Sequence, residues 1–352
     1  MTRRDVLDAI ARYETIADRD CSGLDLSDAD LSGGRFERVR FAGADFSRAN
    51  ILRTGFADCD FTGARFCETR FEQLNWNDMR MPKANLSGAR FFMSLVQGGD
   101  FRGAVFHKAR IHMCTLERSD LSGAVFHGAS IEQNALQAAV LTGADFSGAS
   151  MNRLAFGEAD MRNTILAGAR LRKVLFRGCN FAGYSFAGQT LDMVQFDGAD
   201  LRGANFTDCR LPMCNFNGAD LTDADLCGAW FESAMFFNAK LARAHLTKAS
   251  CRQSIFSEGD LTGADCTNAD MELCQFIKAR CRGALFVDAN LKNADFSHAD
   301  LSDTDFTGAS LYMAQLHRTV EDHARFGSAK ATLLQKPDPD RVAAEDFVPE
   351  EY

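Results

Sequence analysis

Histidine and cysteine are the residues of this 352-residue chain best suited to chemistry, and it contains seven histidines and twelve cysteines. Histidine is the commonest acid–base group in enzymes, and both residue types bind zinc at spacings such as C-x-x-C or H-x-x-x-H. The cysteines follow no such spacing, and no phosphate-binding loop, nucleophile elbow or zinc-protease motif occurs. We therefore expect no metal site and no cofactor. His107 and His127, twenty residues apart, remain as a candidate catalytic pair.

A period of five residues indicates which elements must position these side chains. Every fifth residue from Leu26 to Leu316 is Leu, Phe, Ile, Met, Val, Trp or Cys, without one insertion or deletion. We call these residues centres. The residue two before each centre is mostly Ala, with Gly, Ser, Thr, Cys or Val as substitutes. Neither an amphipathic helix nor a half-buried strand explains a period of five.

A backbone that turns a corner every five residues does explain it. Four corners close a turn of twenty residues, and stacked turns hydrogen-bond like parallel strands about 4.8 Å apart. The centre and the small residue before it then point inward, and the other three residues face water. This pattern, as in "ADLSG" at 29–33, resembles the pentapeptide-repeat family over roughly residues 22–316. The resemblance implies an all-β solenoid, a right-handed quadrilateral parallel β-helix of roughly 15 turns.

Both ends of such a stack need covering, because an open sheet edge invites aggregation. We expect an N-terminal capping helix in residues 1–20, the repeat in 21–316, and a C-terminal cap with an acidic flexible tail in 317–352. The segment "RRDVLDAIARYETI" places Val6, Leu7, Ile10 and Tyr13 near one helical face. In "TVEDHARFGSAKATLLQ" a second helix would cover the last turn with Phe326, Leu333 and Leu334.

On this fold His107 and His127 lie one above the other on an outer wall. We expect them to lack a pocket, a nucleophile and an orienting acid, so we predict no catalytic residues and no enzyme. Cysteines at inward positions, such as Cys251, Cys266 and Cys281, are core residues and suit a reducing compartment. No signal-peptide core and no apolar run of about 18 residues occur, which predicts a cytoplasmic location and no membrane partner.

An acidic ladder precedes the centres of one wall. It resembles the surface of pentapeptide-repeat proteins that imitate duplex DNA and occupy type II topoisomerases. The simpler interpretation is that Asp bonds to the nearby backbone in each turn, and Arg102, Arg162, Arg202 and Arg282 on the same wall offset its charge. The ladder consists of Asp100, Asp120, Asp160, Asp200, Asp220, Asp260 and Asp300.

Apolar side chains at outward positions gather around a different corner. Exposed apolar surface that is contiguous usually marks an interface, and Met, Trp and Arg are enriched in interface cores. Ordinary apolar scatter is the competing interpretation, and the clustering favours a protein-binding stripe. The stripe consists of Phe92, Met93, Leu95, Met113, Leu175, Met193, Met213, Trp230, Met235, Phe237, Ile255 and Ile277.

The leading hypothesis is a non-enzymatic scaffold or adaptor that binds protein through a side wall. A short N-terminal helix that leads directly into the repeat ("ARYETIADRDCSGLDLSDADLSGG") is similar to bacterial pentapeptide-repeat proteins associated with type VI secretion. That resemblance implies an accessory or effector-loading role beside spike and effector proteins. The alternatives are a DNA-mimicking regulator of gyrase and a structural or toxin-neutralising protein. We expect no direct contact with nucleic acid, and a homodimer through one end stays open.

Overall fold

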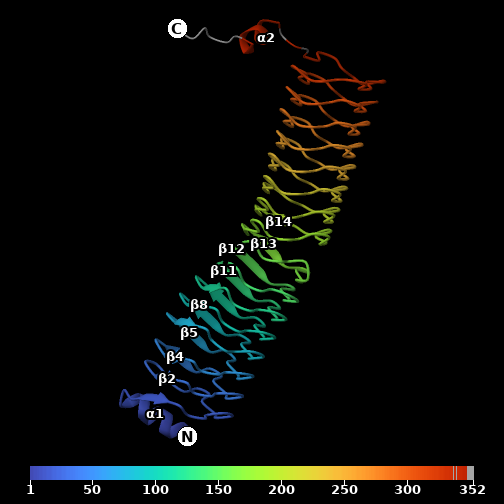
Figure 1. Ribbon diagram of the computed structural model, residues 1–352. Helices are drawn as coiled ribbons and strands as arrows, with labels where there is room; N and C mark the ends of the chain where they lie inside the picture. The colour runs from blue at the N-terminus through green and yellow to red at the C-terminus, as the bar shows by residue number, and fades with distance from the viewer. Residues whose placement is uncertain (336, 338, 347–352) are drawn as a thin grey trace, which may run out of the picture. The chain divides into compact units, whose positions relative to one another are not determined.

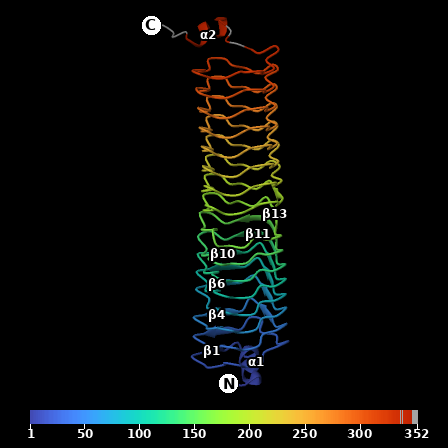
Figure 2. The ribbon, with the colours of Figure 1, turned by 90° about the vertical axis from the view of Figure 1, so that its right-hand side faces the viewer.

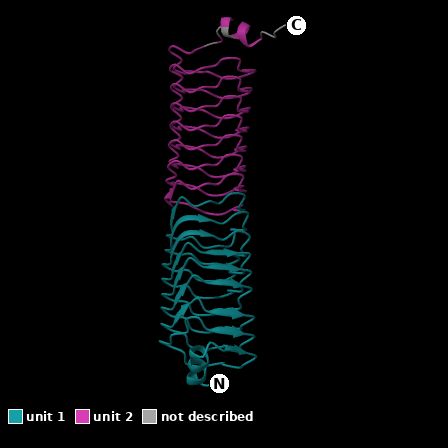
Figure 3. Cartoon of the chain, turned by 90° about the vertical axis from the view of Figure 1, so that its left-hand side faces the viewer, with its two compact units in different colours: residues 1–180 teal, residues 181–352 magenta. Residues whose placement is uncertain are grey.

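The computed structural model describes residues 1–335, 337 and 339–346, with Arg341 described by its backbone alone. The chain divides into two compact units, Met1–Asn180 and Phe181–Tyr352 (Figure 3). Each unit is a stack of coils in which a residue forms a parallel bridge with the residue twenty positions further on. This confirms the predicted parallel β-solenoid. The division into two units has no counterpart in the five-residue pattern, which runs through it unchanged.

The first unit begins with a short helix, α1, at Arg3–Ala11 (Figure 1). A capping box starts it: the Thr2 hydroxyl accepts from the Asp5 amide, and the Asp5 carboxylate accepts from the Thr2 amide. Val6 and Ala9 are the buried residues of this helix. Tyr13 was expected on the same face, but the helix ends before it and its side chain is 91% exposed.

Strands in the first unit are short and mostly three residues long. One parallel sheet contains β1, β2 and β4, and the other contains β3 and β5 to β13. Partners differ by twenty residues throughout, as in Arg70↔Arg90 and Phe91↔Ile111. The bounds are β1 (Thr15–Ala17), β2 (Arg35–Glu37), β3 (Asn50–Leu52), β4 (Gly55–Ala57), β5 (Arg70–Glu72), β6 (Asn75–Asn77), β7 (Arg90–Phe92), β8 (Leu95–Gln97), β9 (Arg110–His112), β10 (Thr115–Glu117), β11 (Ser130–Ala135), β12 (Ser150–Ala155) and β13 (Arg170–Arg172).

The second unit uses the same coils with fewer residues in strands. It contains β14 (Leu191–Asp192), then isolated bridges from Ser185↔Asn205 to Gln315↔Gln335, and ends with helix α2 at Pro339–Glu345 (Figure 2). Each wall of a coil contributes one bridged residue, because a turn separates it from the next wall every five residues.

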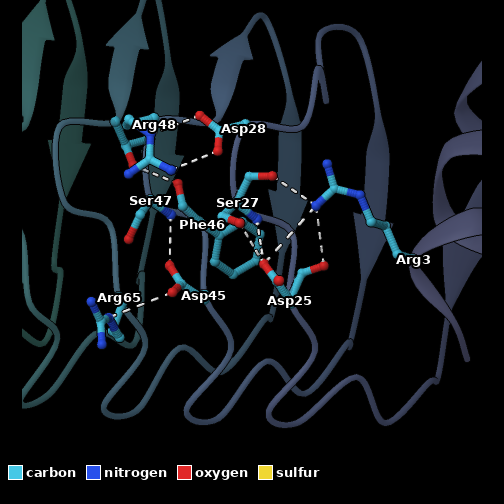
Figure 4. Close-up of polar contacts among 10 residues, drawn as sticks. Arg3, Asp25, Ser27, Asp28, Asp45, Phe46, Ser47, Arg48 and Arg65 are labelled. Carbon is cyan, nitrogen blue, oxygen red and sulfur yellow. Dashed lines mark hydrogen bonds and ion pairs between the residues drawn. The ribbon is translucent and has the colours of Figure 1, made fainter.

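Two local features recur at the corners, a side-chain hydrogen bond and a positive φ. The residue before a centre is often Asp or Asn, whose side-chain oxygen accepts the backbone N–H two residues on, as Asp45 does from Ser47 at 2.8 Å (Figure 4). The residue two after a centre, which we call the corner residue, adopts a positive φ, as at Gly43 with φ 68°. Corner residues on successive coils also pair: Arg48 lies 2.6 Å from Asp28 (Figure 4).

The interior is filled by the centres and by the residues two before them. Phenylalanine rings stack along it from coil to coil, for example Phe216, Phe236 and Phe256 with centroids 4.8 and 4.7 Å apart. All of these rings are fully buried. The periodic Leu and Phe residues are therefore structural, and function must lie on the outward positions.

The C-terminal boundary differs from the prediction. Residues 319–335 were expected to form a helix, but they continue the ladder, with Val320 bridged to Asp300 and Gln335 to Gln315. The backbone edge of the preceding coil explains this, because its unpaired amides and carbonyls are satisfied by one more coil. Phe326 still covers the interior, stacked 5.1 Å from Phe306. The stack of coils therefore continues beyond residue 316, to residue 335, and the helix comes later, at α2. The expected flexible tail falls partly on residues 336, 338 and 347–352, outside the described residues.

Candidate protein-binding surface

One series of corner residues differs from the other three. It follows the centres at 31, 51 and every twentieth residue to 311, and its register continues to position 333. Gly occurs once in it, at Gly33. The other three series use Gly repeatedly, for example Gly23, Gly128 and Gly198. Within the described residues, every Met or Leu with a positive φ belongs to this one series. We call these residues the methionine corner: Met93 and Met113 in the first unit, and Met193, Met213, Leu273, Met313 and Leu333 in the second.

The backbone at the methionine corner does not favour these side chains. Met93 and Met113 have φ of 48° and 54°, where a residue with a Cβ is disfavoured by about 1–2 kcal/mol and glycine is not. Their side chains are also 48% and 47% exposed. These residues thus combine an unfavourable backbone conformation with an exposed apolar side chain. Neither local geometry nor core packing accounts for the choice of methionine here. Exposed, adaptable apolar side chains at positions of positive φ therefore set this corner apart from the other three.

Aromatic and aliphatic neighbours enlarge the methionine corner in the first unit. Phe92 is 39% exposed and stacks on His112 of the next coil, with ring centroids 5.7 Å apart and planes within 9°. Leu95 begins β8 around the corner and is half-buried. Leu175 lies apart from this group, because Thr115, Ala135 and Ala155 occupy its wall position on the coils between. It borders an open hollow of about 620 Å³ that Glu158 and Arg177 also line.

The second unit carries the other seven members of the predicted stripe. Met213 is exposed and Met193 is half-buried on the preceding coil. Trp230 is half-buried because the Arg210 guanidinium lies over its ring, 5.0 Å from the centroid. On the neighbouring wall Met235 and Phe237 are exposed, whereas Ile255 and Ile277 are half-buried.

Every carboxylate of the acidic ladder has a structural partner within its own coils. All seven accept the backbone N–H two residues on, at 2.9–3.2 Å. All but Asp300 also have a Lys or Arg nitrogen within 3.7 Å. The hydrogen bonds from Arg102 and Arg162 hold the pKa values of Asp100 and Asp160 below their usual range. Six of the seven carboxylates thus lie beside a cation of this chain, and all seven bond to its backbone.

The sequence of this fold can now be compared with known families. A model described as "Pentapeptide repeats (8 copies)" matches residues 20–54, 59–92, 94–123, 119–163, 214–252, 234–274, 254–287 and 284–320, and one described as "Pentapeptide repeat region" matches 149–226. These matches span most of the chain. The chain belongs to the pentapeptide-repeat family.

Several solved structures are similar to this pentapeptide-repeat chain. HetL, involved in heterocyst differentiation regulation in Nostoc sp. strain PCC 7120, is 16% identical, with 96% of this chain and 98% of HetL covered and a TM-score of 0.22. QnrB1, a plasmid-mediated fluoroquinolone resistance protein, is 17% identical over 64% of this chain and 92% of its own, with a TM-score of 0.31. Rfr23 of Cyanothece 51142 is 20% identical over 42% and 88%, with a TM-score of 0.16. A comparison with curated proteins gives no match.

The histidine pair on the pentapeptide coils has one partner that the sequence did not indicate. His107 and His127 are both exposed, and Nε2 of His127 lies 2.6 Å from Oδ2 of Asp145. The expectation of no orienting acid was therefore wrong for His127. Ser147 donates to the same carboxylate at 2.5 Å. Because the carboxylate stands between the hydroxyl and the imidazole, His127 is not placed to take a proton from Ser147.

The twelve thiols of the pentapeptide-repeat chain are all free, and ten are buried. Burial raises the pKa of Cys114 to about 11 and of Cys179 and Cys214 to about 12. Because the thiolate is the reactive form, these residues are inert packing groups near neutral pH. The structure also shows that no helix within the described residues has the length and apolar character to cross a membrane.

Proposed function

We propose that this pentapeptide-repeat chain is a non-enzymatic cytoplasmic scaffold that binds a protein partner through the methionine corner. The observation that supports this most directly is the confinement of Met and Leu with positive φ to one of the four corner series. A scaffold with no ligand on that corner would be more stable with glycine, asparagine or aspartate there, residues that many of its other corners have. The chain retains exposed methionines instead.

The chemistry of the corner suits a partner with an apolar ridge. Methionine adapts its shape to irregular apolar surfaces, and aromatic residues and arginine supply most of the strong contacts in interfaces. In the first unit Phe92 stands beside Met93, and in the second Trp230 is held by Arg210. We expect Phe92 and Trp230 to act as rigid anchors and the methionines as adaptable contacts around them.

A pair of glycine substitutions separates binding from stability. Met93→Gly combined with Met113→Gly removes the apolar side chains and also the unfavourable backbone conformation, so the free energy of unfolding should change by less than about 1 kcal/mol. Affinity for the partner should fall at least tenfold. The measurement is quantitative capture of partners from cells of the source organism, followed by titration calorimetry with the partner that is recovered.

The chain offers a matched control in the same series. Gln73 and Gln133 have φ of 53° and 54° and flank the two methionines by one coil on each side. Gln73→Gly with Gln133→Gly makes the same backbone change and should leave the affinity unaltered. Retention of every partner by the methionine double variant would overturn the proposal.

Spike and effector proteins of type VI secretion are the first purified partners to test, because the short N-terminal helix leading directly into the repeat suggested that class. The gyrase alternative predicts that the chain inhibits supercoiling and that Asp200→Lys with Asp220→Lys abolishes the inhibition. The bonded state of the acidic ladder favours the scaffold over that alternative.

A further inference from the structure

Three side chains with metal-binding atoms converge near the end of the second unit. They are His298, His317 and Glu345, and one ligand atom from each lies within 4.8 Å of the other two. Oε2 of Glu345 lies 3.1 Å from Nε2 of His317 and 3.7 Å from Nε2 of His298. Spacing in the sequence could not reveal this group, because its members are nineteen and twenty-eight residues apart.

Each ligand comes from a different element. His298 is a corner residue with φ 62°, and His317 follows the centre on the next coil, which brings the two rings to 5.5 Å between centroids. Glu345 is the last residue of α2. The same helix end is held by Arg318, which donates to the carbonyl oxygen of Val342 at 2.9 Å. The coils thus supply the imidazoles, and the helix supplies the carboxylate.

The donor set matches zinc. Two imidazole nitrogens and one carboxylate oxygen are the three protein ligands of many zinc centres, with the fourth position left for water or a partner's side chain. Ligand atoms about 2.0 Å from a tetrahedral ion lie roughly 3.3 Å apart. The two distances from Glu345, 3.1 and 3.7 Å, are close to this, and all three ligand atoms lie within 4.8 Å of one another. The side chains would have to rotate to bring all three to one ion.

His317 is the buried member of the cluster. The side chain is only 4% exposed, and its Nδ1 has no hydrogen-bond partner within the described residues. An unsatisfied buried polar atom costs about 1–3 kcal/mol. That cost falls on Nδ1, whereas Nε2 faces Glu345 and is the nitrogen available to an ion.

Arg318 is the charged group that opposes a cation here. Its Nε lies 3.2 Å from Oε2 of Glu345, and its Nη2 lies 2.5 Å from Oδ1 of Asp346. Two carboxylates thus face one guanidinium, which leaves the cluster net negative when both histidines are neutral. A carboxylate oxygen has more than one lone pair, so Glu345 can bind an ion and keep the contact with Arg318.

We propose that His298, His317 and Glu345 form a zinc site that clamps α2 onto the last coils. The ion would replace a surface contact between a carboxylate and two imidazoles with three coordinate bonds. Residues 339–346, which Arg318 already contacts, would then be held against the coils more firmly in the metal-bound protein. This site lies on different residues from the methionine corner, so a test that contradicts one of the two proposals does not contradict the other.

The test is a titration of the full chain with Zn²⁺ by calorimetry and with Co²⁺ by visible absorption, which reports a tetrahedral site with nitrogen and oxygen ligands. We expect one equivalent to bind. Glu345→Gln and His298→Asn should each weaken binding at least tenfold, and they are preferable to substitution of the buried His317. His323→Asn is the control, because this exposed histidine lies 3.5 Å from Asp303 outside the cluster.

Two further outcomes bear on the proposal. Zn²⁺ should slow proteolysis within residues 339–346 in the wild type but not in Glu345→Gln. Absence of stoichiometric binding, or equal affinity in the wild type and both ligand variants, would overturn it.

Discussion

At position 134 an asparagine replaces the small residue that faces the interior, and its side chain is 5% exposed. Its amide nitrogen donates to the carbonyl oxygens of Ile111 and Glu132, both at 2.8 Å, and its amide oxygen accepts from the Cys114 N–H at 2.6 Å. The side chain therefore satisfies backbone groups on its own coil and the preceding one. Leu154 occupies the same inward position on the next coil and is also buried, so this position accepts residues larger than alanine.

Asn134→Ala should lower the free energy of unfolding by about 1–3 kcal/mol, because three buried backbone groups lose their partner. The measurement is the urea midpoint followed by circular dichroism. Asn50→Ala is the control, because Asn50 is exposed and its amide reaches only Asp30, at 3.3 Å. Equal midpoints for Asn134→Ala and the wild type would show that water replaces the amide.

Stacked phenylalanines, together with the backbone ladder, join successive coils of the second unit. Phe216, Phe236, Phe256, Phe276 and Phe296 form one column with centroid distances of 4.6–5.1 Å and planes within 7° of each other. Each ring contacts the rings above and below and the adjoining wall. Loss of one ring therefore leaves a cavity that the rigid backbone ladder cannot close.

Phe236→Ala should cost about 3–5 kcal/mol of stability, whereas Phe237→Ala, one residue further on, should stay within about 0.5 kcal/mol. Phe236 is fully buried and Phe237 is 42% exposed. Unfolding midpoints in guanidinium measure both. The loss of affinity for the partner should be larger for Phe237→Ala than for Phe236→Ala, because Phe237 belongs to the predicted stripe and Phe236 does not. Similar destabilisation by the two variants would contradict the division into core and surface.

Across the whole molecule, carboxylates that accept hydrogen bonds in the folded state link stability to pH. Serine and threonine hydrogen bonds lower the pKa values of Asp20 and Asp305, and the Arg102 hydrogen bond does the same for Asp100. A lowered folded-state pKa stabilises the fold above the unfolded value of about 3.9. That contribution is lost as the pH falls through the lower folded-state values.

Buried thiols link stability to pH in the opposite direction. A folded-state pKa raised to about 12, as for Cys179 and Cys214, stabilises the fold below the unfolded value of about 8.5. That contribution declines as the pH rises from there through the folded-state pKa. Both ends of the pH range therefore favour the unfolded chain.

Thermal unfolding midpoints should thus be nearly constant between about pH 5 and 8, and should fall below pH 4 and above pH 9. High salt should reduce only the part of the acid effect that comes from surface ion pairs, because it screens them. The carboxylate–backbone bonds remain under those conditions. A midpoint that stays level down to pH 2.5 would contradict the assigned pKa directions.

The five-residue pattern alone was sufficient to predict the solenoid, the inward residues and the outward positions of Phe92, Met93 and Leu95. This works because each pentad repeats the same requirement: a large apolar residue and a smaller one must fill a narrow interior. A contact between coils needs only the twenty-residue register, so the phenylalanine columns could also be read from the sequence.

Other features depend on contacts that the pattern does not encode. Residues 317–335 have lost the apolar centre at Glu321, yet the open backbone edge of the preceding coil still recruits them. The bonding of the acidic ladder and the partner of His127 depend on side-chain rotamers at turns. His298 and His317 meet Glu345 only because α2 folds back onto the coils. Backbone pairing and side-chain geometry, rather than residue periodicity, set these features.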